Sequence, residues 1–425
     1  MLLPPISRRR VLRGAAALAT SAAAAPFVRT RPVRDRLKLA AVGVANRGSS
    51  NVAGVLSQDV AVMCDVDTRM LERGVNQVVE AGQVKPTTYA DWRELLEKER
   101  DLAGIVISTP DHLHAPIARA ALRRKIAVYC EKPLTRTVAE ARQLQALASS
   151  SGVATQMGTQ IHATDNYRRV VEAIRAGAIG DVHTVHVVCR KSWSNGKFGE
   201  PKPAPANLDW DLWLGPTPER PYCDGVHPAN WRRFWAFGTG TVGDMACHWV
   251  DLVHWALGLE TPVAIEVEGP AVDPVGTPDW MHVKWSHAAA GDRKAVDVHW
   301  WDGGVAPEEA PGGDSHVFIG TKGRIVSNYS SMRVERAEGQ PAWEAPARSI
   351  ASSPGHYVEW LDAIREGTPT SPLCSFDYSG PLTQTVLLAT VAYRAGGRAR
   401  WDAEAETFDV DAGLLASEER PGWDV

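Results

Sequence analysis

The stretch LKLAAVGVANRG, residues 37–48, decides the fold of this 425-residue chain. An apolar run leads into Gly43, and Gly48 follows with Ala45 between them. A strand that ends in such a turn before a helix is the dinucleotide-binding fingerprint, here with alanine at the second glycine. Gly43 permits the tight turn, Gly48 permits close helix–strand packing, and the backbone at Ala45 must approach a pyrophosphate at the helix N-terminus. Taken alone, the motif could also be an ordinary glycine-rich turn between a strand and a helix that binds no nucleotide.

Outward from this stretch, residues 35–157 alternate between short apolar runs and helical segments. Strand-like runs occupy residues 37–43, 60–65, 104–108, 127–131 and 153–157. Helical segments occupy residues 49–56, 69–81, 92–99, 115–123 and 138–149. The alternation predicts a doubly wound α/β Rossmann domain, whose parallel sheet is covered on both faces.

Asp65 ends the second apolar run, 22 residues after Gly43. An acidic residue at this position can bind the ribose hydroxyls of a dinucleotide. Its carboxylate would repel a 2′-phosphate, so we predict NAD, with NADP as the weaker alternative. A helix cap is the other interpretation of Asp65, and Asp67 competes for that role.

Two later strand ends carry polar residues where ligands bind in doubly wound sheets. The first reads Ser108-Thr109-Pro110-Asp111-His112, in which we expect Asp111 to cap the following helix. The second reads Glu131-Lys132-Pro133, which places Lys132 where a hydroxyl substrate would lie beside a nicotinamide. The residues expected to bind the cofactor are Gly43, Ala45, Asn46, Arg47, Gly48, Asp65, Thr109, Pro110, His112, Glu131 and Lys132.

Residues 158–425 have a different pattern. Alternation with a period of two recurs in residues 182–188, 263–267, 281–286 and 295–300, which predicts an open, largely antiparallel sheet in an α+β domain. Helical segments return at residues 357–365 and 381–395, and we expect them to pack back on the core.

The segment GTGTVGDMACHWVD, residues 238–251, runs from a flexible glycine stretch into a helix. Asp244, His248 and Asp251 share one helix face. A carboxylate one turn from an imidazole can orient the ring and stabilise its charged form, which suits a general base. A structural helix with a packed histidine is the alternative, and His254 is expected only to pack.

Eleven of the sixteen tryptophans lie between Trp193 and Trp301. Aromatic faces stack on the apolar faces of sugars, so Trp193, Trp231 and Trp235 are candidates for binding substrate. Six of the others are expected in the core: Trp210, Trp213, Trp249, Trp255, Trp285 and Trp300.

The N-terminus reads SRRRVLR at residues 7–13, followed by an alanine-rich run. This is the pattern of a twin-arginine export signal, and we assign residues 1–34 to signal and linker. A mitochondrial-type presequence and a membrane anchor are the alternatives. An anchor is disfavoured, because it needs about 20 strongly apolar residues and this run is shorter and mostly alanine. Export predicts a periplasmic enzyme that works without a pool of free nucleotide, so its cofactor must be tightly bound and recycled in place.

Composition excludes some partners. Residues 1–25 hold four arginines and no acid, so the rest of the chain has a formal charge of −8, which argues against nucleic acid as a partner. The six cysteines are scattered without a CxxC pair and are expected as small buried residues, with no metal site.

Together these residues resemble the Gfo/Idh/MocA oxidoreductase family. The resemblance rests on the altered glycine fingerprint, Asp65, Glu131-Lys132-Pro133 and the Asp244-x-x-x-His248-x-x-Asp251 segment. It implies a nicotinamide cofactor, a carbohydrate-like substrate and a C-terminal open sheet that often forms the interface of a homo-oligomer. By the same resemblance, Lys132 and His248 flank the reacting hydroxyl and Asp244 supports them.

These inferences predict an NAD(P)-dependent oxidoreductase acting on a hydroxyl of a sugar or polyol. Oxidation of one sugar would be coupled to reduction of another, as in glucose–fructose oxidoreductase-like members of the family. A redox-neutral NAD-dependent glycosidase is the first alternative, and a non-catalytic sugar-binding protein is the second.

Overall fold

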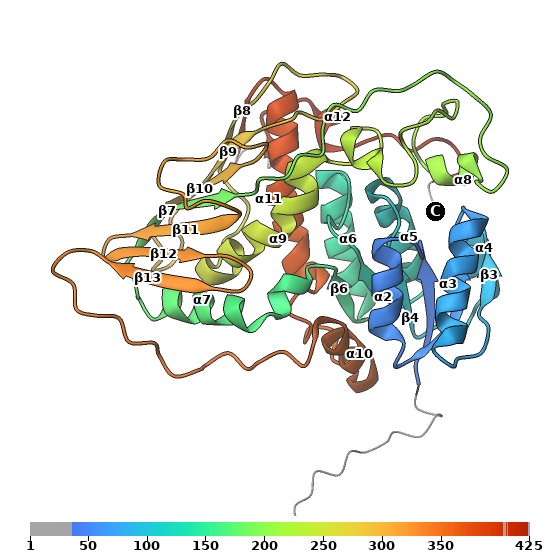
Figure 1. Ribbon diagram of the computed structural model, residues 1–425, viewed down its shortest axis with the longest axis horizontal. Coiled ribbons are helices and arrows are strands. Elements are labelled where there is room, and N and C mark those ends of the chain that lie inside the picture. Colours follow the sequence, from blue (N-terminus) through green and yellow to red (C-terminus); the bar gives the residue numbers. More distant parts are fainter. Residues whose placement is uncertain (1–35, 403–404, 406, 424–425) are drawn as a thin grey trace, which may run out of the picture. The chain divides into compact units, whose positions relative to one another are not determined.

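The first sheet grows from β1 (Lys38–Val42), whose residues are almost completely buried between two layers of helices. The computed structural model describes residues 36–402, 405 and 407–423, so the predicted export signal lies outside the described residues. Six parallel strands form the sheet in the order β3-β2-β1-β4-β5-β6 (Figure 1). The other strands are β2 (Asp59–Cys64), β3 (Thr87–Tyr89), β4 (Gly104–Ile107), β5 (Ala127–Cys130) and β6 (Thr155–Met157).

The helices between these strands follow the predicted alternation. They are α2 (Arg47–Val55), α3 (Thr68–Glu80), α4 (Trp92–Lys98), α5 (Asp111–Arg123) and α6 (Val138–Ser151). Because all the strands are parallel, their carboxyl ends lie at one edge of the sheet, and a crevice forms there where the strand order reverses between β1 and β4. The predicted doubly wound Rossmann sheet is confirmed.

The second sheet has nine strands in the order β13-β12-β11-β7-β10-β9-β8-β14-β15. Among the described strand pairs of this second sheet, only β7 and β10 are parallel, so the predicted, largely antiparallel sheet is also confirmed. The strands are β7 (Val182–Val188), β8 (Ala264–Glu268), β9 (His282–His287), β10 (Val296–Trp301), β11 (Ser315–Gly320), β12 (Gly323–Ser327), β13 (Met332–Arg336), β14 (Arg398–Asp402) and β15 (Thr407–Phe408).

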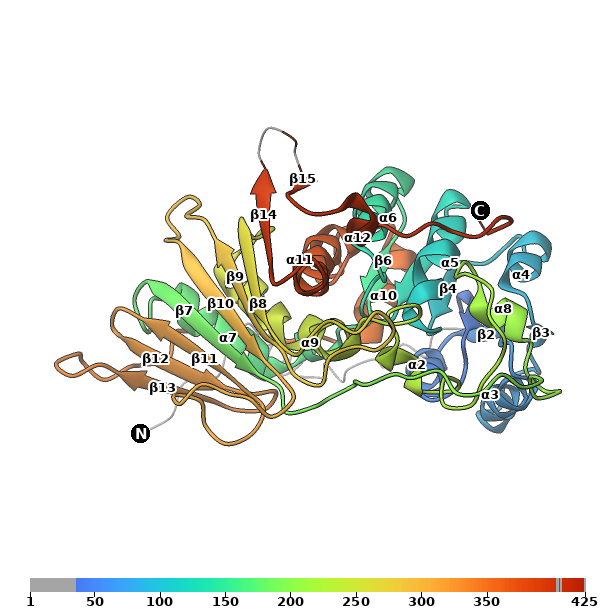
Figure 2. The same cartoon turned by 90° about the horizontal axis from the view of Figure 1, so that it is seen from above.

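One face of this sheet is covered by helices. Figure 2 shows α9 (Gly240–Leu257) and α11 (Phe376–Arg394) between the second sheet and the helices of the first. Buried and half-exposed residues alternate along β9 and β10, as expected for a sheet with one open face. The remaining helical elements are η2 (Gln160–Ala163), α7 (Asp165–Arg175), α8 (Trp210–Leu214), η3 (Asn230–Arg233), α10 (His356–Glu366) and α12 (Ala412–Leu415).

Helix α10 packs against the Rossmann sheet. Trp360 of α10 is fully buried in the same cluster as Leu39 of β1. A side chain at Gly104 would lie 2.9 Å from the Trp360 ring, so β4 needs glycine at this position. Residues Leu37–Val425 therefore form one compact unit.

Two simpler expectations can also be checked. All six cysteines are free and buried, in agreement with their interpretation as small core residues. None of the helices in the described part of the chain is long and apolar enough to span a membrane.

Candidate active site

A cavity of about 310 Å³ lies at the carboxyl edge of the Rossmann sheet. Its walls come from the ends of β1, β2, β4 and β5, from η3 and from His248 in the middle of α9. Nine of the eleven residues expected to bind the cofactor line it: Gly43, Ala45, Asn46, Arg47, Asp65, Thr109, Pro110, Glu131 and Lys132. Gly48 and His112, although described, lie outside the lining.

The turn after β1 requires both of its glycines. Gly43 has a φ of 77°, and a side chain there would lie 2.8 Å from the carbonyl of Ser108. A side chain at Gly48 would lie 2.0 Å from the carbonyl oxygen of Gly43, so Gly48 serves the close packing of α2 on the turn. Ala45 lines the cavity between them, so its methyl group is accommodated.

Asp65 closes the turn from the neighbouring strand. Its carboxylate accepts hydrogen bonds from the backbone N–H groups of Val44 and Asp67, each at 3.0 Å. Burial raises the pKa of Asp65 despite these bonds. Asp67 instead caps α3 by accepting from the N–H of Arg69, and Asp65 lines the cavity.

Glu131 organises the end of β5. Its Oε1 atom accepts hydrogen bonds at 3.0 Å from Arg47 Nε, Asn51 Nδ2 and Gln160 Nε2. Arg47 also donates to the hydroxyl of Tyr357 in α10, at 3.3 Å. Helix α10 therefore holds the side chain of the first residue of α2.

Lys132 meets α9 through Asp244. Its Nζ atom donates to Asp244 Oδ1 at 2.7 Å and to the Asp244 carbonyl oxygen at 2.6 Å. Arg232 Nε donates to the same Oδ1 atom, also at 2.7 Å. Burial alone would raise the pKa of Asp244, but the adjacent Lys132 and Arg232 cations hold it well below its usual range.

The expected support of His248 by Asp244 is wrong. Asp244 accepts from Lys132 and Arg232 instead, because both cations reach the carboxylate from outside its own helix. His248 lines the cavity, and its Nδ1 atom is buried with no hydrogen-bond partner among the described residues. Burial, reinforced by the charge of Lys132, lowers the pKa of His248 well below its usual value. The ring is therefore neutral at neutral pH.

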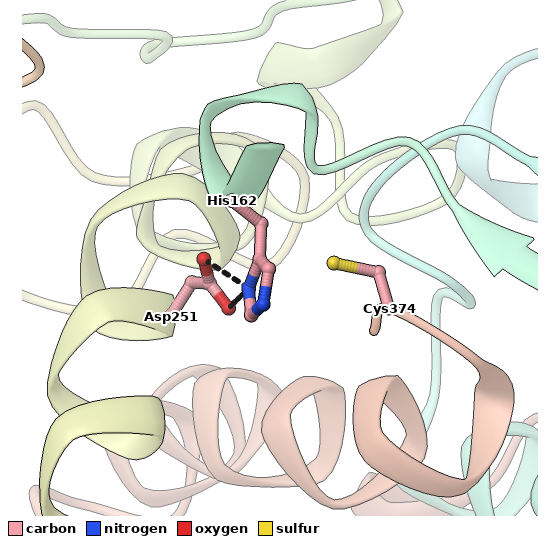
Figure 3. Close-up of side chains that lie close together, drawn as sticks. All are labelled: His162, Asp251 and Cys374. Atoms are coloured by element: carbon pink, nitrogen blue, oxygen red, sulfur yellow. Dashed lines mark hydrogen bonds and ion pairs between the residues drawn. The ribbon is translucent and has the colours of Figure 1, made fainter. Parts of the chain in front are cut away.

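Asp251 shares the helix with Asp244 and His248 but has other hydrogen-bond partners. Figure 3 shows it beside His162 and Cys374, and its two carboxylate oxygens lie 2.9 and 3.0 Å from His162 Nδ1. The Tyr378 hydroxyl donates to Asp251 Oδ1 at 2.7 Å. Donor atoms of Asp251, His162 and Cys374 lie within 4.8 Å of one another, but the carboxylate is already engaged by His162 and Tyr378. This arrangement is a buried polar network that joins η2, α9 and α11.

Asp111 was expected to cap α5, but it is instead the first residue of that helix, and Pro110 occupies the cap position. Its side chain lines the cavity, with Oδ2 accepting a hydrogen bond from the Thr239 hydroxyl at 3.0 Å. Its Oδ1 atom is buried without a hydrogen-bond partner in the described structure. Burial raises the pKa of Asp111 to about 7, although Arg232 opposes the shift.

His112 is a correction to the predicted cofactor site. It points away from the cavity, with Nε2 2.9 Å from the Trp213 carbonyl oxygen and Nδ1 3.3 Å from that of Phe237. Burial lowers its pKa to about 3. The ring therefore ties α5 to the loops of the second half.

The tryptophans that line the cavity differ in part from those predicted to bind substrate. Of the three candidates for stacking on a sugar, Trp231 lines the cavity, whereas Trp193 and Trp235 are outside the lining formed by the described residues. Trp213 was expected in the core; it stacks on Trp210 at 4.7 Å and also reaches the cavity.

Sequence reasoning missed Arg232 altogether and gave Asp111 only a capping role. Arg232 lies in η3, a four-residue 3₁₀ helix too short to show periodicity in the sequence, so only tertiary contacts reveal its partner. The position of Asp111 at the end of a Rossmann strand was a usable signal, because ligands bind at such ends.

Fold and cavity together define an oxidoreductase with an NAD-binding Rossmann domain. Residues 33–159 match the profile described as "Oxidoreductase family, NAD-binding Rossmann fold", and residues 178–338 match "Oxidoreductase family, C-terminal alpha/beta domain". The chain belongs to the Gfo/Idh/MocA oxidoreductase family.

The individual relatives share less than 30% of their residues with this chain over the matched regions. Levoglucosan dehydrogenase from Pseudarthrobacter phenanthrenivorans is 23% identical over 345 residues, which cover 71% of this chain and 81% of that protein. A glycosyl hydrolase family 109 protein from Stenotrophomonas maltophilia is 28% identical over 239 residues, or 53% of this chain and 50% of that protein. The crystal structure of GenD2 from gentamicin A biosynthesis, in complex with NAD, is 21% identical with a TM-score of 0.60, and the match covers 87% of this chain and 97% of GenD2. At this identity the structural match shows the fold.

Proposed function

We propose that this protein is an NAD-dependent oxidoreductase that acts on a hydroxyl group of a sugar or polyol. The observation that carries the proposal is that Lys132 and His248, from different halves of the chain, line one cavity with the glycine turn and Asp65. The residues fit NAD, because the turn is free of side chains at Gly43 and an acidic side chain stands at the ribose position. The similarity to levoglucosan dehydrogenase supports a sugar substrate.

Lys132 binds and polarises the reacting hydroxyl in this proposal. An ammonium group has three N–H donors, and Asp244 takes two of them through its carboxylate and its carbonyl oxygen. The third N–H remains for the substrate oxygen, on which negative charge develops during oxidation. Asp244 is therefore a positioning residue, which fixes the direction of the Lys132 ammonium.

His248 takes the proton of the hydroxyl group. Its lowered pKa keeps the ring neutral, so a lone pair is available. Since Nδ1 is buried, Nε2 is the nitrogen left for the cavity. NAD, when bound, supplies the acceptor for the hydride.

The experiment is an assay with a panel of free sugars, polyols and aryl glycosides, with and without added NAD. Formation of reduced nucleotide or of a paired oxidised and reduced sugar supports the oxidoreductase. If no member of the panel reacts with or without added NAD, and the protein binds no NAD, the proposal is refuted.

A redox-neutral glycosidase is the second candidate, and the similarity to the glycosyl hydrolase family 109 protein favours it. With NAD as the transient hydride acceptor, Lys132 and His248 would assist oxidation of a sugar hydroxyl to a ketone, which would acidify a neighbouring C–H bond and would be reduced again after the aglycone leaves. Release of the aryl aglycone without accumulation of reduced nucleotide distinguishes this reaction from net oxidation.

The twin-arginine pattern in residues 7–13 adds a cellular proposal. An exported protein would carry NAD from the cytoplasm, hold it tightly and regenerate it in place. Extraction of nucleotide from extensively washed, denatured protein tests this directly, and activity that depends wholly on added NAD would contradict it.

A further inference from the structure

Arg232 has a guanidinium group that is fixed at two points and free at a third. Its Nε atom donates to Asp244 at 2.7 Å, and its Cζ atom lies 4.1 Å from the centre of the Trp231 ring. Within the described residues, its two Nη atoms have no hydrogen-bond partner, and the side chain lines the cavity beside Lys132 and His248. The side chain is 26% exposed, so a ligand in the cavity has access to it.

The backbone around Arg232 is tightly packed. A side chain at Gly238 would lie 2.7 Å from Arg232 Cα, and the N–H of Thr277 donates to the carbonyl oxygen of Arg233 at 3.0 Å. The guanidinium is thus presented by a braced segment and oriented by a carboxylate and an aromatic ring. Such preorganisation lowers the entropy cost of forming a two-point hydrogen bond.

Neutralising Asp244 does not require Arg232. Lys132 already forms two hydrogen bonds to Asp244, so the second cation leaves the group of Lys132, Arg232 and Asp244 with a net charge of +1. Asp111, which faces this group, has a pKa raised to about 7 by burial and so compensates little of the excess below that pH. Below that pH the group formed by Lys132, Arg232, Asp244 and Asp111 therefore carries a net positive charge.

We propose that Arg232 binds an anionic substituent of the substrate, so that the site prefers acidic sugars, either carboxylated or phosphorylated, to neutral ones. The proposal rests on the proposed function, since it assumes that a sugar binds beside Lys132 and His248. A carboxylate or phosphate presents two oxygens to the paired Nη donors, which is the geometry that a guanidinium recognises best.

The test is calorimetric titration of the NAD-loaded protein with D-glucuronate, D-glucuronamide, D-glucose 6-phosphate and D-glucose. We expect at least one anion to bind about 10- to 100-fold more tightly than its neutral partner, the range for a charge-assisted pair. In Arg232→Gln that preference should disappear. Arg220→Gln is the matched control, because Arg220 also stacks on an aromatic ring, 3.8 Å from the centre of Phe198, but lies outside the cavity lining.

The two anions distinguish a carboxylate site from a phosphate site. Equal affinity for each anion and its neutral partner, including failure of both anions to bind, overturns the proposal. A loss of NAD affinity in Arg232→Gln with an unchanged anion preference also overturns it, because the guanidinium would then serve the cofactor.

Reduced nucleotide is measured in the same samples. Arg232-dependent binding of an anion without turnover of any sugar would refute the proposed oxidoreductase and leave the anion site standing. Turnover of sugars in wild type with no preference for the anionic member of each pair, and with the same rates in Arg232→Gln, would refute the anion site and leave the oxidoreductase standing.

Discussion

Replacing Asp244 with asparagine should destabilise the protein and slow turnover together. The Lys132 and Asp244 side chains are only 10% and 6% exposed, so the change leaves a buried cation without its counter-charge. Breaking such a pair costs about 3–5 kcal/mol. The 26% exposure of Arg232 and the retained amide oxygen place the expected loss near the lower end, at about 3 kcal/mol. Turnover should fall roughly 100-fold, the effect of displacing a catalytic group by about 1 Å.

Urea unfolding measures the first effect and initial rates measure the second. Asp211→Asn is the matched control: Asp211 accepts an equally short 2.7 Å bond from Arg420, but its carboxylate is 68% exposed. Its loss should cost under about 1 kcal/mol.

The pH dependence gives an independent check. Because the folded protein lowers the pKa of Asp244, the advantage of wild type should be complete well above the ordinary value of 3.8 and should shrink as the pH falls below it. An Asp244→Asn protein whose unfolding free energy and turnover both match those of wild type would refute the assigned ion pair.

Three further predictions concern other side chains of the cavity. Lys132→Ala and His248→Ala should each lower turnover by about 10²–10⁴-fold while bound nucleotide is retained, and near-normal rates in a loaded His248→Ala protein would exclude it as the base. Asp65→Ser should relax the preference for NAD over NADP in titrations with both nucleotides, whereas an unchanged preference would assign Asp65 only to closing the turn. Asp111→Asn should remove a penalty that grows by about 1.4 kcal/mol per pH unit as pH rises from 3.8 to about 7, where burial keeps the folded carboxyl protonated and the unfolded one ionises. Parallel unfolding curves for wild type and Asp111→Asn across that range would contradict the raised pKa.

Most of the fold was predictable because its strands are long apolar runs or clear alternations. The elements missed include the helix α7 and the strands β3, β13, β14 and β15. The strand β3 has three residues and pairs only with β2, and the last two strands, β14 and β15, end the second sheet. Backbone pairing with a neighbour defines such edge strands, and their own residues carry little pattern.

The site was predictable in part, for a related reason. Helical spacing correctly places Asp244 and His248 on one helix, but it cannot tell which outside group will reach the carboxylate. Lys132 lies 112 residues away in sequence and takes it. Asp251 likewise finds His162, 89 residues away, so the shared helix face resolves into two separate networks.

The hydrogen bonds between Tyr357 of α10 and two residues of α2 have a consequence for folding during synthesis, because α2 can form them only after α10 has been translated. The Tyr357 hydroxyl donates to Asn51 at 2.8 Å and accepts from Arg47, yet it is translated some 300 residues later than either. A ribosome that has released only the Rossmann segment therefore exposes an unfinished nucleotide pocket and an uncovered β-sheet face where Trp360 belongs. Residues 33–159 match a family profile on their own, but as an isolated domain they would lack the contacts that α10 provides. Any chimera that borrows this nucleotide domain must also bring residues 356–366 with it.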